Sequence, residues 1–118
     1  MKRVYVCGSF RFVSKMEELE TVLRKENVDF IISKNMDVLG ILGCLKKIDQ
    51  ADVMYVVNPN GYVGKSVSLD IGYAYARNKP IYTMYPIDDP PVMSLVNGVL
   101  SFEELIILLK HNDHTSIF

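Results

Sequence analysis

Short apolar blocks recur along the chain. Each spans four or five residues with few polar interruptions, which is the pattern of a strand that is covered on both faces of a sheet. These blocks lie at residues 4–7, 28–32, 53–57 and 81–85. A weaker block at residues 96–100 predicts a fifth strand.

Between the blocks, apolar residues repeat every three or four positions, which indicates amphipathic helices. Helices are expected at residues 14–25, 37–50, 67–78 and 102–109. Ser14 with Glu17 should cap the first of them and Ser101 the last, and Ser66 can cap the third. Alternating strands and helices predict one α/β domain, an open doubly wound sheet of four or five parallel strands of the flavodoxin or Rossmann type, flanked by helices.

In such a sheet, ligands bind beyond the carboxyl ends of the strands. The first loop at that edge begins with Gly8, which lets a ligand approach the strand end. Ser9 and Arg11 follow as hydrogen-bond donors suited to a phosphate or carboxylate, and Phe10 and Phe12 could stack on a planar base. A solvated arginine with two core phenylalanines is the alternative interpretation of this loop.

The loop after the third strand reads NPNGYVGKSVSLD, residues 58–70. A nucleoside-triphosphate P-loop needs a glycine where this chain has Pro59, which has no N–H group, so that interpretation is rejected. Two glycines permit tight turns, and hydroxyl and ammonium donors surround the start of the next helix, which attracts anions. The candidate binding residues of this loop are Asn58, Gly61, Gly64, Lys65, Ser66 and Ser68.

Asp70 follows these donors, in or near the first turn of the third helix. Two interpretations of Asp70 remain open. It could complement the positive end of the helix, as aspartate often does, or it could carry chemistry. Gly72 inside the same helix indicates close packing against the sheet or against another subunit.

The 118 residues carry a formal net charge of −1 and no basic run, so a broad nucleic-acid surface is not expected. Cys7 and Cys44 are too few for a metal site and are expected to be reduced. No apolar stretch approaches the roughly 20 residues of a membrane span, and the first apolar block is too short for a signal peptide. The pattern predicts a cytoplasmic protein without a membrane partner. Residues 111–118 form a polar tail, expected to be frayed or bound to a partner.

The stretches VYVCGSFRF and IDQADVMYVVNPNGYVGKSVSLDIGYAYARNKPIY together resemble the nucleoside 2-deoxyribosyltransferase superfamily. The most specific part is an acidic residue that opens a helix, followed by Ile-Gly-Tyr-Ala and then Lys-Pro. The Gly-Ser-x-Arg after the first strand resembles the branch that hydrolyses nucleoside 5′-monophosphates, in which the arginine helps to hold the phosphate.

The resemblance implies that a carboxylate attacks the anomeric carbon of a nucleoside and forms a glycosyl-enzyme intermediate, without a cofactor. Asp70 occupies the position of that nucleophile. Asn97 lies where the superfamily places a residue, often from a neighbouring subunit, that steadies the carboxylate or the sugar. A homodimer or higher homo-oligomer that binds a nucleoside or nucleotide is therefore expected.

The chain departs from this pattern in two ways. The superfamily nucleophile is normally glutamate, and Asp70 is one methylene shorter. The transferases also carry an acidic residue one or two turns earlier, where this chain has Gly64, Lys65 and Ser66. Hydrolysis is therefore favoured over base transfer, and a non-catalytic nucleotide-binding or sensing module remains an alternative. A flavodoxin-like receiver or electron carrier is disfavoured, because no acidic pair ends the first strand.

Overall fold

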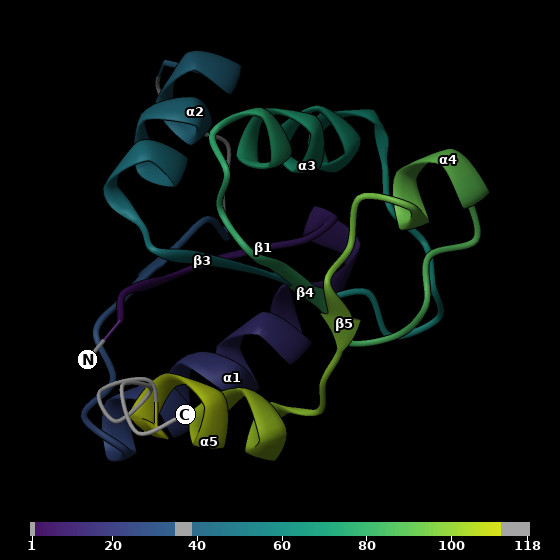
Figure 1. Ribbon diagram of the computed structural model, residues 1–118. Helices are drawn as coiled ribbons and strands as arrows, with labels where there is room; N and C mark the ends of the chain where they lie inside the picture. Colours follow the sequence, from purple (N-terminus) through teal and green to yellow (C-terminus); the bar gives the residue numbers. More distant parts are fainter. Residues whose placement is uncertain (1, 35–38, 112–118) are drawn as a thin grey trace.

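The computed structural model describes residues 2–34 and 39–111 and has the predicted architecture, a parallel sheet with helices on both faces (Figure 1). Five parallel strands lie in the order β2-β1-β3-β4-β5. Their bounds are β1 Val4–Cys7, β2 Phe30–Ile32, β3 Val53–Val56, β4 Ile81–Thr83 and β5 Gly98–Val99. The fifth strand, expected from a weak pattern, is therefore confirmed as a short edge strand.

The helices form two layers, with α1 and α5 on one face of the sheet and α2 and α3 on the other (Figure 1). Side chains of β1 alternate between the layers. Val4 and Val6 pack with α1 and α5, while Tyr5 and Cys7 pack with α2 and α3. The helical bounds are η1 Phe10–Phe12, α1 Val13–Lys25, α2 Ile41–Gln50, α3 Lys65–Ala76, α4 Pro90–Met93 and α5 Phe102–His111.

Two predicted helix caps are wrong and one is confirmed. The first helix begins at Val13 after the short η1 turn, so Ser14 lies inside it and does not cap it. The third begins at Lys65 with Gly64 in the cap position, so Ser66 also lies inside its helix. Ser101 does cap α5, because its Oγ accepts from the Glu104 N–H at 3.1 Å and its own N–H donates to the Glu104 carboxylate at 2.8 Å.

Other element bounds also differ from the predictions. The short helix α4 was not predicted. It begins with two prolines, and the side chain of Asp89 accepts a hydrogen bond from the backbone N–H of Val92 at 3.3 Å. Residues 37 and 38, expected in the second helix, and residues 112–118 of the tail lie outside the described part of the chain.

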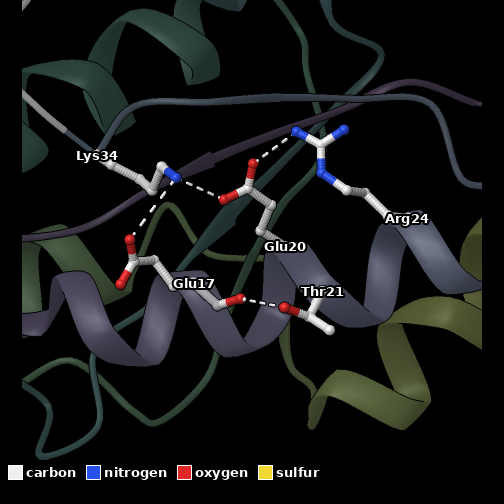
Figure 2. Close-up of polar contacts among 5 residues, drawn as sticks. All are labelled: Glu17, Glu20, Thr21, Arg24 and Lys34. Carbon is white, nitrogen blue, oxygen red and sulfur yellow. Dashed lines mark hydrogen bonds and ion pairs between the residues drawn. The ribbon is translucent and has the colours of Figure 1, made fainter.

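A cluster of charged side chains holds the segment that follows β2 against α1 (Figure 2). The Lys34 ammonium lies 2.6 Å from a carboxylate oxygen of Glu20 and 3.9 Å from one of Glu17. Arg24 approaches the other Glu20 oxygen at 2.8 Å, and hydrogen bonds from Lys34 and Arg24 lower the pKa of Glu20. The neighbouring Ser33 donates its N–H to Val6 O at 3.0 Å, so the polar residue that follows this strand has a fixed place beside β1.

Asn58 joins the loops that follow β3 and β4. Its fully buried side chain donates to Tyr85 O at 2.8 Å and accepts from Tyr85 N at 3.0 Å. Gly61, with φ of +83°, approaches the same second loop, and a Cβ there would lie 2.8 Å from Pro86 O. These contacts hold one side of the loop after β3 against the loop after β4, and they leave the opposite side of the loop open.

We expect Asn58→Ala to lower the free energy of unfolding by about 1–3 kcal/mol, because two buried hydrogen bonds are lost together. Urea denaturation followed by circular dichroism measures the change. The matched control is Asn60→Ala in the exposed part of the same loop, expected to stay within about 0.5 kcal/mol of the parent protein. An Asn58→Ala protein as stable as the control would contradict a structural role for this amide.

Candidate functional site

A pocket of about 420 Å³ opens at the carboxyl ends of β1 and β3, within the size range of small-molecule sites. The strand order reverses between these two strands, which is the point where doubly wound sheets bind their ligands. The lining residues come from the ends of β1 and β2 and from α2, the loop after β3 and α3. They are Cys7, Gly8, Ser9, Phe10, Ser33, Cys44, Tyr62, Gly64, Lys65, Ser66, Val67 and Asp70.

Seven residues singled out from the sequence are brought together in this pocket: Gly8, Ser9, Phe10, Gly64, Lys65, Ser66 and Asp70. The sequence interpretation missed five others, namely Cys7, Ser33, Cys44, Tyr62 and Val67. Ser33 could have been found, because it follows β2 and the ends of parallel strands share one edge. Cys44 could not, because nothing local indicates which face of α2 meets the pocket.

Several predicted residues lie outside the pocket lining. Ser68 donates its hydroxyl to Gly64 O at 3.0 Å, inside the first turn of α3. Asn58 is engaged with Tyr85, as described above, and Gly61 lines a separate cavity beside the loop after β4. Arg11 lies next to the pocket, with its guanidinium carbon 4.2 Å from the centroid of the Tyr62 ring.

Asn97 lies near the amino end of β4, at the end of the sheet opposite to the pocket. Its side-chain oxygen accepts from the backbone N–H of Ile81, the first residue of β4, at 2.8 Å. It lines a third cavity with Tyr75 and Lys79. Within one chain, Asn97 is therefore not a neighbour of Asp70, and a role at the pocket requires the Asn97 of another subunit.

Asp70 is the buried acid of the pocket. It lies in the second turn of α3, is only 3% exposed, and its Oδ1 has no hydrogen-bond partner in the part of the chain that the structure describes. An aspartate that only complements the helix dipole belongs in the exposed first turn, where the dipole acts most strongly. A buried carboxylate oxygen without a partner costs stability, and such groups are concentrated at functional sites.

Burial raises the pKa of the Asp70 carboxyl to about 7, against opposing effects of the Tyr5 hydroxyl and the Lys47 ammonium. Tyr5 lies under the pocket on β1 with its hydroxyl fully buried. That hydroxyl is near enough to Asp70 to influence its charge, although the geometry falls short of a full hydrogen bond. Because Asp70 changes its charge near neutral pH, it can serve as a nucleophile or exchange protons there.

Two thiols, Cys7 and Cys44, line the pocket together with Asp70. Both cysteines are free, Cys7 buried and Cys44 partly exposed. Burial, together with the negative charge of Asp70, raises the pKa of the Cys7 thiol well above its usual value, which keeps it protonated at neutral pH. Cys7 is therefore a neutral part of the pocket wall rather than a competing nucleophile.

The start of α3 provides the positive end of the pocket. Gly64 occupies the cap position and offers no side-chain bond to the first turn, so the backbone N–H groups there have no side-chain cap. Lys65 and Ser66 line the pocket at the same place. A helix N-terminus with an ammonium and a hydroxyl beside it is suited to bind an anion such as a phosphate.

Two further properties concern the described part of the chain. Within residues 2–34 and 39–111, no three histidine, cysteine, aspartate or glutamate side chains are grouped so that they could bind a metal ion. Nor does any helix in those ranges combine the length and the apolar character that crossing a membrane requires.

No protein-family model and no curated protein sequence matches this chain. Solved structures do share its fold. The 2-deoxyribosyltransferase from Bacillus psychrosaccharolyticus has a TM-score of 0.63 at 14% identity, over 88% of this chain and 90% of that protein. The CMP N-glycosidase from Clostridium botulinum has a TM-score of 0.57 at 16% identity, over 92% of this chain and 98% of the other.

A third similar structure is the Vibrio vulnificus NanR protein complexed with ManNAc-6P, with a TM-score of 0.66 at 18% identity. The alignment covers 95% of this chain but only 46% of NanR. At these identities the comparisons establish a common fold. The proteins that share it include a 2-deoxyribosyltransferase, a CMP N-glycosidase and a protein complexed with ManNAc-6P.

We expect Asp70→Asn to stabilise the protein above neutral pH. The folded-state pKa of about 7 lies above the ordinary aspartate pKa of 3.8, so between about pH 4 and pH 7 only the folded state keeps the proton. Stability of the parent protein therefore falls as pH rises through this window, whereas the amide has no such dependence. The advantage of Asp70→Asn should grow across the window to the order of 2–4 kcal/mol.

Urea denaturation of both proteins at a series of pH values tests this expectation. The control is Asp88→Asn, which changes an exposed aspartate and should leave the pH dependence of the parent protein intact. A stability difference between Asp70→Asn and the parent protein that is the same at pH 4.5 and pH 8 would mean that the folded-state pKa is not raised.

Proposed function

We propose that this protein is an N-glycosidase that cleaves the bond between base and sugar in nucleosides or nucleoside 5′-monophosphates. The observation that carries the proposal is the Asp70 carboxylate, buried, without a partner on Oδ1 and with a raised pKa, in the pocket between β1 and β3. The fold shared with a 2-deoxyribosyltransferase and a CMP N-glycosidase supports the same chemistry.

In the proposed reaction, the ionised Asp70 carboxylate attacks the anomeric carbon of the sugar. The carbon–nitrogen bond breaks, its electron pair leaves with the base, and the base takes up a proton from water. The sugar is then held on Asp70 as an ester. Water attacks the same carbon in the second step, the ester bond breaks, and its electrons return to Asp70 while the water proton is released.

Other residues in and beside the pocket are suited to bind a phosphorylated substrate. Lys65, Ser66 and the uncapped start of α3 offer positive charge and donors for a phosphate, and Ser9 adds a hydroxyl from the opposite loop. Phe10 is about half exposed in the pocket and can contact a planar base. Arg11, beside the pocket, adds a guanidinium suited to two phosphate oxygens.

Hydrolysis is favoured over base transfer because Asp70 is the only carboxylate among the residues that line the pocket in the described part of the chain. Transfer requires a second free base to be held and deprotonated after the first has left. A second acid or base would assist this step, whereas water needs no such site.

A non-catalytic sensing module is the second candidate function. The similarity to the NanR protein complexed with ManNAc-6P supports it, as does an aspartate where the resembling superfamily normally has glutamate. Both candidates use the same pocket and the same anion-binding groups. They differ in whether the substrate is consumed.

We expect Asp70→Asn to abolish base release, because an amide does not form the glycosyl ester, while binding persists. In the parent protein, kcat/KM should rise with pH through about 7 as Asp70 ionises. Chromatography of a panel of nucleosides and 5′-monophosphates, with and without a second free base, measures released and exchanged base.

The control for this experiment is again Asp88→Asn, which should keep full activity. Asp70→Glu should be slower by a hundredfold or so, because the added methylene displaces the carboxylate by about 1 Å. Saturable binding in the parent protein without any released base would favour the sensing module instead.

We also propose that the protein is a homo-oligomer in which a neighbour completes the pocket. Leu42 on α2 and Leu69 on α3 are each more than 60% exposed, and Phe10 is 49% exposed beside the pocket. Exposed apolar side chains that gather on adjoining elements are typical of surfaces that another chain covers, and α2 packs against α3. Such an arrangement would allow Asn97 of a neighbour to reach Asp70, which the Asn97 of the same chain does not.

Sedimentation at micromolar concentration should give a dimer or larger species, and a monomer mass would contradict the proposal. Mixing two inactive variants, Asp70→Asn chains and Asn97→Asp chains, tests the shared site. The Asn97→Asp substitution keeps an oxygen for the Ile81 N–H, so the fold of that chain should be preserved. Partial return of activity on mixing is expected, and its absence would show that each site belongs to one chain.

A further inference from the structure

Two loops meet at the rim of the pocket through one tyrosine. The Arg11 guanidinium, from the turn after β1, lies over the ring of Tyr62, from the loop after β3, at 4.2 Å from its centroid. Phe12 contacts the same ring edge-on, with centroids 6.3 Å apart and an interplanar angle of 71°. Tyr62 itself lines the pocket, so this contact fixes Arg11 beside it.

Arg11 differs from the other three arginines in its partners. Arg3 pairs with Asp29 at 2.9 Å, Arg24 with Glu20 at 2.8 Å and Arg77 with Asp49 at 3.1 Å. Across residues 2–34 and 39–111, no carboxylate forms an ion pair with Arg11.

The contact with Tyr62 uses the positive charge of the guanidinium and leaves its N–H groups available, because an aromatic face attracts a cation through its electron density. A long side chain on the surface otherwise samples many rotamers, and holding one of them reduces the entropy lost on binding a ligand. Tyr62 therefore keeps an arginine without a carboxylate partner close to the anion-binding start of α3.

We propose that Tyr62 is a positioning residue for phosphate recognition: it holds Arg11 so that the pocket selects a 5′-monophosphate over the corresponding nucleoside. The inference rests on the substrate class of the proposed function and adds to it the residue that sets the preference for a phosphate. Tyr62 acts through Arg11, so the two residues should not contribute independently.

The experiment measures dissociation constants by calorimetry for the four ribonucleosides and their 5′-monophosphates, in the Asp70→Asn background so that no turnover occurs. The quantity compared is the phosphate preference, the dissociation constant of the nucleoside divided by that of its monophosphate. Contacts of Tyr62 with the base or sugar cancel in this ratio, so a general loss of packing does not change it.

Arg11→Ala should reduce the phosphate preference about tenfold or more, because a charge-assisted contact is lost. Tyr62→Leu should reduce it about two- to fivefold, the usual size of a cation–π contact near the surface. Tyr62→Phe keeps the ring and should retain most of the preference. Tyr75→Leu, which changes an exposed tyrosine of α3 outside the pocket lining, is the matched control and should change nothing.

The double variant Arg11→Ala with Tyr62→Leu decides between positioning and direct contact. Its phosphate preference should equal that of Arg11→Ala alone, because Tyr62 has no arginine left to hold. A further loss in the double variant, an unchanged preference in Tyr62→Leu, or a parent protein without any preference would each overturn the inference. Phosphate preference without base release in the otherwise unaltered chain would overturn only the glycosidase proposal.

Discussion

The central position of β1 is the constraint on which the rest of the structure depends. This strand pairs with β2 on one side and β3 on the other, and its four side chains are all buried. Because successive side chains point to opposite faces, Val4 and Val6 join one core and Tyr5 and Cys7 the other. The strand order reverses beside β1, so the same strand that supports both cores also opens the pocket at its carboxyl end.

The pocket holds Asp70, whose burial lowers the stability of the protein, among apolar side chains that are packed against the sheet. Asp70 is held on α3 by the apolar neighbours Val67, Ile71 and Ala74, which are buried against the sheet. Their packing keeps a carboxylate at a depth where its charge is disfavoured, and this is what brings its pKa near neutrality. The stability lost at Asp70 and the reactivity proposed for it therefore have one physical cause, which is burial.

Fold and function are separable in this molecule. Proteins with the same fold include a deoxyribosyltransferase, a CMP N-glycosidase and a protein complexed with ManNAc-6P. The switch point and the start of α3 belong to the architecture, so the fold accounts for the position of the proposed anion site. Whether a ligand bound there is cleaved would depend on individual side chains, above all on the carboxylate of Asp70.

The sequence by itself determined the alternation of strands and helices, the parallel sheet and the edge at which a ligand would bind, because periodicity and strand position are local properties. It also indicated Ser9, Lys65 and Asp70 as candidate site residues, because they follow the first and third strands along the chain. Only the tertiary structure decided that Asp70 is buried in the second turn of α3. It also decided that Asn58 joins the loops after β3 and β4 instead of lining the pocket, and that Asn97 lies at the end of the sheet opposite to the pocket. Burial and hydrogen-bond partners depend on segments distant in the chain, such as Tyr5 under Asp70 and Tyr85 beside Asn58, and no local pattern specifies them.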